Sequence, residues 1–405
     1  MRVLIHTDEY YPTAQACAYR MQVFADIFIK LGDEVTVVTS SANKANGIIE
    51  RDKHKEKIIY SPAIRMKKKT TVMRMLNNLT FGITSFFSAI AAGNVDVVIT
   101  TSPPPLVSIT GWIIAKCKRA KIVYDVRDIW PDIALEMGSF TEDSIFCKAF
   151  KKISAFMYKH ADVVTTVSPG KVEKIRGYVS MQSGRKSGPN HINKVWLVGN
   201  GFDESFANSE FYQDVVDRYE LDKKLTCVYI GNIGLAQGLG ALLDVAAKTK
   251  YKDIQFLCFG MGAEKEILEK RVQNEGLANV KFCGVVDHSK VFSILSRAKL
   301  SFIPLKNGNM KDSVPTKVYE ALGIGCPVLL VAEGDSADIV AETGLGRSVS
   351  PNEPQNLVDV FDDIIDHYDE FDVHRDEAIH LMHNKYSRQK IAEELDNRLH
   401  KLCGK

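Results

Sequence analysis

The run Thr226-Cys227-Val228-Tyr229-Ile230-Gly231-Asn232-Ile233-Gly234 joins a short apolar segment to a glycine-rich turn. Apolar strands that end in turns and alternate with helical segments are typical of parallel sheets covered on both faces. Four further runs of this kind follow: Ile254–Phe259, Val280–Gly284, Leu300–Pro304 and Pro327–Val331. The second half of the chain therefore predicts a doubly wound α/β domain.

The first half carries an equivalent series, which opens with Arg2–His6 and continues with Val35–Thr39, Asp96–Thr100, Ile122–Val126, Val163–Val167 and Val195–Val198. A chain of 405 residues exceeds the usual size of one domain, so we predict two. We place the boundary after the turn-forming run Asn200–Asp203, which gives domains 1–203 and 204–386. A charged amphipathic helix within 387–405 is expected to pack back on the N-terminal domain. Residues 176–194, rich in Ser, Gly, Lys and Asn, are expected to form a surface loop.

Composition excludes several classes of protein. The net charge is +2, whereas a nucleic-acid-binding protein is usually more basic, so we predict no nucleic-acid partner. The eight cysteines contain no C-x-x-C pair, which argues against a zinc or redox site and fits a reduced, cytoplasmic location. The first residues show no signal-peptide pattern, and the apolar stretch 79–92 is too short and too polar to span a bilayer.

The most informative local segment is 311–323, which reads KDSVPTKVYEALG. We expect Pro315 in the first turn of a helix, where its missing N–H costs nothing. The free backbone donors of that turn, near Ser313 and Thr316, would bind a phosphate, and Lys317 would add a positive charge. Glu320 shares the face of Lys317 and could accept ribose hydroxyls. The alternative is an exposed Lys–Glu pair on a surface helix.

At this point the chain resembles the retaining glycosyltransferases of family 4, most of all the branch that builds bacterial O-antigen and capsule polysaccharides. The resemblance implies the GT-B fold: two Rossmann-like domains facing each other across a cleft. The Glu-x7-Glu motif of the family corresponds to Asp312-x7-Glu320 here. The resemblance implies that Glu320 holds the ribose and that Asp312 faces the donor sugar. From its place in the first turn of the helix, we expect Lys317 to stabilise the leaving diphosphate. The shorter Asp312 is a departure from the family pattern.

Other segments match the family in order and spacing. The turn with Gly231, Asn232 and Gln237 lies where many members carry Arg and Lys for the diphosphate. Gly260 belongs to a "G-x-G" turn after the following strand. The resemblance implies that Val285 and Val286 contact the nucleobase. Without the resemblance, the glycines would indicate only a plain turn from strand to helix.

Two segments of the N-terminal half complete the expected site. Arg127 and Asp128 follow an apolar strand in the motif "R-D-x-W-P" of this branch, and we predict catalytic roles for both. A buried Arg–Asp pair that fixes the loop is the alternative. Gln15 and Ala16 stand where relatives carry Gly-Gly beside the donor diphosphate.

A basic run with Lys67, Lys68 and Lys69 precedes the apolar stretch 79–92. Such a pattern attracts anionic lipid headgroups, so it could mark acceptor binding and peripheral membrane contact. A solvated loop before a core helix is the alternative.

We therefore predict a metal-independent, retaining glycosyltransferase that needs no cofactor. Its donor would be a nucleotide-sugar, expected to be UDP-linked with an N-acetylated amino sugar such as N-acetyl-L-fucosamine. Its acceptor would be a polyprenyl-diphosphate-linked saccharide. Since no positioned carboxylate nucleophile is evident, we favour attack by the acceptor on the same face of the sugar from which the diphosphate leaves. The alternatives are a UDP-sugar epimerase of the same fold and a non-catalytic nucleotide-sugar-binding protein.

Overall fold

The structure is a computed structural model that describes residues 1–11, 16–41, 56–64, 71–136, 141–183, 193–306 and 310–405. The chain divides into two compact units. Unit 1 comprises Met1–Asn200 and Gln389–Lys405, and unit 2 comprises Gly201–Arg388. Among the described residues, no helix is both long and apolar enough to cross a bilayer.

Unit 1 contains a parallel sheet of seven strands in the order β3-β2-β1-β4-β5-β6-β7. Every residue of β4 is buried, as expected for a central strand with both faces covered. The chain order reverses between β1 and β4, which makes this edge the switch point of the sheet. The strands are β1 (Arg2–His6), β2 (Glu34–Ser40), β3 (Lys57–Ser61), β4 (Val97–Ser102), β5 (Lys121–Val126), β6 (Val163–Thr166) and β7 (Val195–Leu197).

Helices cover this sheet with two separate apolar cores. One core joins the sheet to α1 and to α16, through Ala392, Leu395 and Leu399. The other core joins it to α2, α3, α5 and α6, with Ala89, Ile114, Met157 and Ile175 as members. The helices of unit 1 are α1 (Ala16–Lys30), α2 (Thr71–Ile90), α3 (Pro105–Lys118), α4 (Asp132–Glu136), α5 (Ile145–His160), α6 (Pro169–Ser183) and α16 (Arg388–Cys403).

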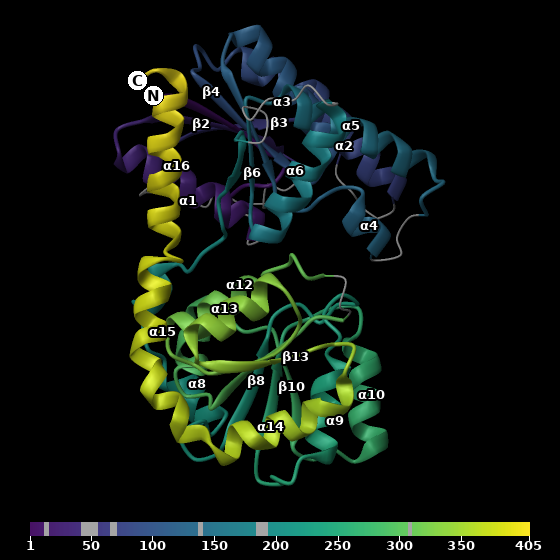
Figure 1. The fold of residues 1–405 in the computed structure, drawn as a ribbon, viewed down its shortest axis with the longest axis vertical. Coiled ribbons are helices and arrows are strands. Elements are labelled where there is room, and N and C mark those ends of the chain that lie inside the picture. Colours follow the sequence, from purple (N-terminus) through teal and green to yellow (C-terminus); the bar gives the residue numbers. More distant parts are fainter. Residues whose placement is uncertain (12–15, 42–55, 65–70, 137–140, 184–192, 307–309) are drawn as a thin grey trace. The chain divides into compact units, whose positions relative to one another are not determined.

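Unit 2 repeats the plan with six parallel strands in the order β10-β9-β8-β11-β12-β13. The strands are β8 (Thr226–Ile230), β9 (Gln255–Phe259), β10 (Val280–Gly284), β11 (Leu300–Pro304), β12 (Val328–Val331) and β13 (Gly346–Val349). In Figure 1, α12 (Thr316–Gly323) and α13 (Asp335–Thr343) lie on one side of this sheet, and α9 (Gly240–Lys248) and α10 (Lys265–Glu275) on the other. The prediction of two doubly wound α/β domains is thus confirmed.

The remaining elements of unit 2 lie around this sheet. They are α7 (Glu204–Ala207), α8 (Gln213–Arg218), α11 (His288–Leu295), η4 (Pro354–Asn356), α14 (Leu357–Asp366), η5 (Tyr368–Phe371) and α15 (Asp372–Asn384). Two of the sheet strands, β3 in unit 1 and β13 in unit 2, were not expected from the sequence. Both pair at a sheet edge and bury only part of their length, so their apolar pattern is weak.

One predicted loop is partly helical in the structure, and the boundary between the two units lies before the predicted one. The expected loop 176–194 is wrong for its first part, because α6 continues to Ser183, with Val179 buried in the core of unit 1. Tertiary packing thus outweighs the weak helical propensity of Gly177 and the serines. The predicted boundary followed Asp203, whereas the two units divide after Asn200.

Candidate functional site

The expected donor residues of unit 2 gather where its sheet changes direction. β8 and β11 are neighbours in the sheet but not in the chain, and the segments after them diverge. In open α/β sheets, ligands bind beyond the carboxyl ends of the strands at this point. The glycine-rich turn follows β8, and the segment that leads into α12 follows β11. These segments contain Gly231, Asn232, Gln237, Asp312, Ser313, Thr316, Lys317 and Glu320.

The two glycine-rich turns pack backbone against backbone. The N–H of Gly231 donates to the carbonyl of Phe259 at 2.9 Å, and that of Ile233 donates to Met261 at 2.9 Å. A Cβ atom on Gly260 would lie 1.8 Å from the Gly231 carbonyl oxygen, and Gly260 has a φ of +146°. Only glycine allows this approach. The approach fixes the shape of the turn that faces α12.

Lys317 reaches this turn from the first turn of α12. Its Nζ atom would be 3.1 Å from a Cβ atom on Gly231 and lies 4.1 Å from the centroid of the Tyr229 ring. The atom is buried and makes no hydrogen bond within the described residues. Burial lowers the pKa of Lys317 to about 7, and the nearby Glu320 opposes this shift. A buried amine without an acceptor is suited to an incoming anion.

Glu320 lies on the same side of α12, next to a residue that the sequence analysis missed. The Nε2 atom of His288 is 3.7 Å from a carboxylate oxygen of Glu320. The nearby Glu320 carboxylate raises the pKa of His288. His288 opens α11 after the N-cap Asp287, far from Glu320 in the chain. No local sequence signal links them.

The segment before α12 is held in place by a neighbouring loop. Asp335 donates its N–H to the carbonyl of Lys311, and a Cβ atom on Gly334 would lie 2.2 Å from that carbonyl oxygen. Asp312 is buried, and Ser313 and Thr316 are half-buried. Pro315 is the N-cap of α12, so it precedes the first turn in which we expected it.

The other expected donor residues of unit 2 differ in exposure. Asn232 is exposed and Gln237 is half-buried. Val285 is 73% exposed just beyond the carboxyl end of β10, whereas Val286 packs partly against the core. Val285 is therefore the more accessible of the two residues. Their assignment to the nucleobase stays a prediction.

In unit 1, Arg127 and Asp128 lie at the carboxyl end of β5. Arg127 donates from Nη2 to the carbonyl of Pro103 at 2.8 Å, and its Nε atom is buried without a hydrogen bond. Asp128 lies 3.9 Å from the buried Lys171. Burial raises the pKa of nearby Asp8 to about 7, with Glu9 adding to the rise and Arg127 opposing it. The sequence analysis missed Asp8 and Lys171 as members of this polar cluster.

Some expected residues cannot be placed. Gln15, Lys67, Lys68 and Lys69 lie outside the described residues, and of Ala16 only the backbone, the first residue of α1, is described. The predictions for these residues therefore stay predictions.

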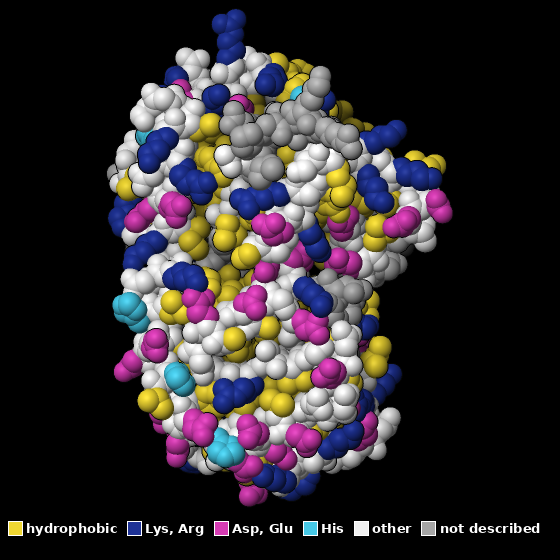
Figure 2. Space-filling model, viewed as in Figure 1, with side chains coloured by type: hydrophobic (Ala, Val, Ile, Leu, Met, Phe, Trp, Pro, Cys, Tyr) yellow, Lys and Arg dark blue, Asp and Glu magenta, His cyan; other side chains and the backbone are white. Residues whose placement is uncertain are grey.

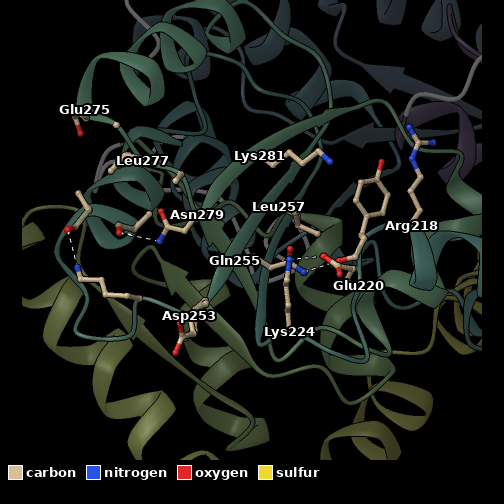
Figure 3. A pocket seen from close by; sticks show the side chains of 17 residues that line it. Arg218, Glu220, Lys224, Asp253, Gln255, Leu257, Glu275, Leu277, Asn279 and Lys281 are labelled. Carbon is tan, nitrogen blue, oxygen red and sulfur yellow. Dashed lines mark hydrogen bonds and ion pairs between the residues drawn. The ribbon is translucent and has the colours of Figure 1, made fainter.

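A cavity of about 680 Å³ lies at the opposite edge of the unit 2 sheet (Figure 3). Gln255 and Asn279 line it at the amino ends of β9 and β10. The helices α8, α9 and α10 end at this edge and present carbonyl groups, which disfavour phosphate. The cavity holds Arg218, Lys224, Lys252 and Lys281 together with Glu220, Asp253 and Glu275, so its charge is mixed. The cavity is therefore less suited to a phosphate than the carboxyl edge of the same sheet.

One cluster among the described residues could offer three ligand atoms to a metal: Asp33, Asp396 and His400. Asp33 and His400 already contact each other at 3.0 Å. Asp33 precedes β2, so the cluster lies at the amino end of the unit 1 strands. It is thus at the edge away from Arg127 and Asp128.

Residues 214–379 match the family profile described as "Glycosyl transferases group 1". WbjE of Pseudomonas aeruginosa, a candidate glycosyltransferase, is 23% identical over 273 residues, which cover 66% of this chain and 66% of WbjE. WcaI of Escherichia coli (strain K12), a candidate glycosyl transferase of colanic acid biosynthesis, is 22% identical over 386 residues, which cover 88% of this chain and 90% of WcaI.

Two solved structures share the fold over nearly the whole chain. Sucrose-phosphate synthase from Thermosynechococcus elongatus superposes with a TM-score of 0.79 at 17% identity, covering 99% of this chain and 98% of that one. HepE of Anabaena, solved with UDP and glucose, gives a TM-score of 0.74 at 14% identity, covering 99% of this chain and all of HepE (100%). The fold is thus GT-B, and residues 214–379 of its second unit match the glycosyl transferases group 1 profile.

Proposed function

We propose that this chain is a glycosyltransferase that takes a sugar from a nucleotide-sugar donor bound at the carboxyl edge of the unit 2 sheet. The observation that carries the proposal is the buried Lys317 amine, which makes no hydrogen bond and faces the Gly231 turn at the switch point. A diphosphate there would receive the charge of Lys317 and the free N–H groups of the first turn of α12. The match of residues 214–379 to glycosyl transferases group 1 supports the same activity.

The roles of the site residues follow from this position. Glu320, held by His288, would accept the ribose hydroxyls, and Val285 would contact the base. Asp312 would contact the donor sugar, while Asn232 and Gln237 would donate neutral hydrogen bonds near the diphosphate. Because those two side chains are uncharged, Lys317 would be the main cation for the leaving group.

For the reaction we propose retention of the anomeric configuration without a metal. The bond between the anomeric carbon and the diphosphate oxygen breaks, and an acceptor hydroxyl attacks from the same face. The leaving phosphate oxygen takes the acceptor proton, and Lys317 with the α12 amides stabilises the diphosphate charge. Arg127 and Asp128 would act from unit 1. An inverted product, detected by the anomeric coupling constant in NMR spectra, would refute this step.

For the substrates we propose a UDP-linked, N-acetylated amino sugar and a polyprenyl-diphosphate-linked saccharide, in bacterial surface polysaccharide synthesis. HepE, which shares the fold, was solved with UDP and glucose. The name of WcaI places it in colanic acid biosynthesis. Both names support the class of reaction, and N-acetyl-L-fucosamine stays the specific sugar that we predict. We place the protein in the cytoplasm, at the inner face of the membrane.

A thermal-shift panel of UDP-, GDP- and dTDP-sugars tests the proposal first, since a ligand that binds the native state raises the melting temperature. At least one of these donors should raise it, and the same donor should be hydrolysed slowly by wild type but not by Glu320→Ala. A thermal shift without any hydrolysis would favour the non-catalytic binding protein, and absence of any shift would contradict the proposal. Formation of a new UDP-sugar from the donor alone would favour the epimerase.

A further inference from the structure

Two buried carboxylates and an imidazole lie where α16 packs on unit 1. Asp396 and His400 are one turn apart on α16, so they share a face of the helix. Asp33 comes from the turn before β2, far from them in the chain. The side chain of Asp33 is 2% exposed and that of Asp396 is 5% exposed. Asp and Glu side chains normally lie in water, as Figure 2 shows over one face of the molecule, so a buried pair needs compensating charge.

The cations at this cluster leave two of the carboxylate oxygens unpaired. The Met1 amine contacts Oδ1 of Asp33, and the Nε2 atom of His400 lies 3.0 Å from the same oxygen. Oδ2 of Asp33 and Oδ1 of Asp396 are buried and make no hydrogen bond within the described residues. Burial and the neighbouring Asp33 carboxyl raise the pKa of Asp396. Buried polar atoms without a partner are rare in folded proteins, and here two of them belong to one cluster.

The spacing of the three side chains fits a tetrahedral metal ion. Asp33, Asp396 and His400 each offer one ligand atom, and these atoms all lie within 4.8 Å of one another. The Nε2 atom of His400 is 3.0 Å from an oxygen of Asp33 and 3.6 Å from an oxygen of Asp396. Ligand atoms bonded to a tetrahedral ion at about 2.0–2.1 Å are about 3.3–3.4 Å apart. The two measured separations bracket this value, so small shifts would bring the atoms onto one ion.

From this geometry we propose that Asp33, Asp396 and His400 bind a divalent transition-metal ion, for which Zn²⁺ is the best match, with water as the fourth ligand. Zn²⁺ accepts imidazole nitrogen and carboxylate oxygen together. Mg²⁺ and Ca²⁺ prefer oxygen ligands alone, so the imidazole disfavours them. The ion would pair with the carboxylate oxygens that lack a partner. His400 would coordinate as a neutral imidazole through Nε2, and the proton on that atom would pass to solvent.

The ion would fix the last helix of the chain to unit 1. Residues 389–405 belong to unit 1, although the chain before them belongs to unit 2. α16 already packs on the core of unit 1 through Ala392, Leu395 and Leu399, and the ion would add a bond from the helix to the turn before β2. The role proposed is therefore structural. It is independent of the proposed transferase activity, which is measured by donor binding in unit 2 and needs no metal.

The test is titration calorimetry of Zn²⁺ into the full chain after treatment with a chelator. Wild type should bind one Zn²⁺ ion with a Kd below about 10 μM. The same ion should raise the melting temperature of the chelator-treated protein, and Mg²⁺ at the same concentration should not. Asp396→Asn and His400→Gln should each lose at least about tenfold in Zn²⁺ affinity, since even the loss of an outer-shell partner has an effect of that size.

His367→Gln is the matched control, because Asp363 and His367 form an exposed pair with the same spacing, 3.0 Å apart. It should bind Zn²⁺ as wild type does. Circular dichroism and one cooperative melting transition show that each variant folds. Absence of Zn²⁺ binding by chelator-treated wild type would overturn the proposal whatever the variants do, and would leave the two carboxylates to share a proton. Equal affinity in wild type, Asp396→Asn and His400→Gln would also overturn it, because the ion would then bind elsewhere.

Discussion

The Nζ atom of Lys317 lies 4.1 Å from the centroid of the Tyr229 ring and makes no hydrogen bond among the described residues. The Tyr229 hydroxyl in turn donates to the carbonyl of Asn232, so the ring is fixed beneath the glycine-rich turn. The amine is thus held against an aromatic face, out of water, at the point where we propose that the donor diphosphate binds. A cation in such a place gains about 0.5–2 kcal/mol from the ring but loses its hydration.

The first prediction concerns stability. The pKa of Lys317 is lowered from 10.5 to about 7, so between these values the unfolded chain binds a proton that the folded chain does not. The free energy of unfolding therefore rises with pH between about 7 and 10.5. Below about pH 7, the folded protein bears the whole cost of burying the charged amine. Lys317→Met should raise the melting temperature by at least about 2 °C near pH 6, and by less near pH 10.

Calorimetry of wild type and Lys317→Met at both pH values checks this. Lys270→Met, at an exposed position of α10, is the control and should change the melting temperature little at either pH. A lower melting temperature for Lys317→Met near pH 6 would show that the amine already has a stabilising partner in the free protein.

The second prediction concerns donor affinity. If the diphosphate binds the ammonium form of Lys317, affinity for a UDP-sugar should fall by at least about tenfold as pH rises from about 7 to about 9. Between about pH 7 and pH 9, binding should also take up a proton, which calorimetry in buffers of different ionisation enthalpy measures. Glu320, His288 and Tyr229 also face this site. Because the pKa of His288 is raised, His288→Asn is the control for titration of the imidazole. If Lys317 sets the profile, this variant should keep the same slope of affinity against pH above pH 7. A flat profile in wild type would contradict the prediction.

The third prediction concerns the ribose. Glu320→Ala should lose at least about tenfold in UDP affinity, because a hydrogen bond to a charged group contributes about 1.5–3 kcal/mol. The loss should be much smaller for 2′-deoxy-UDP, which lacks one hydroxyl that Glu320 would accept. Titration calorimetry of both ligands with both proteins gives the coupling energy. Additive losses would mean that Glu320 does not hold the ribose.

Much of this arrangement follows from local sequence. The strands were predictable because β1, β4, β8 and β11 are almost wholly buried and each contains a run of apolar residues. Lys317 and Glu320 were predictable because residues three apart share a helix face.

The contacts between distant segments were not predictable in this way. His288 meets Glu320, Tyr229 lies under Lys317, and Gly260 packs on Gly231 only after the sheet of unit 2 has brought their turns together. The helical segment 176–183 was missed for a similar reason, since packing against the core of unit 1 stabilises it and its residues have low helical propensity.

The fourth prediction concerns the glycine turns. Gly260→Ala places a Cβ atom 1.8 Å from the Gly231 carbonyl oxygen, so the donor turn must move. We expect a loss of at least about 2 kcal/mol in the free energy of unfolding, with weaker donor binding. Gly276→Ala separates this clash from backbone strain, because Gly276 also has a positive φ (+66°) but nothing within 4 Å of its Cβ position. Urea titrations should therefore show a much smaller loss for Gly276→Ala; equal losses would rule out the clash as the cause.

The most direct test of the account is titration calorimetry of a UDP-sugar with wild type and with Lys317→Ala at neutral pH. The account predicts that wild type binds the donor and that Lys317→Ala weakens binding by at least about tenfold, with a matching loss of donor hydrolysis. Equal affinity and equal hydrolysis in the two proteins would contradict it, because the diphosphate would then bind away from the first turn of α12.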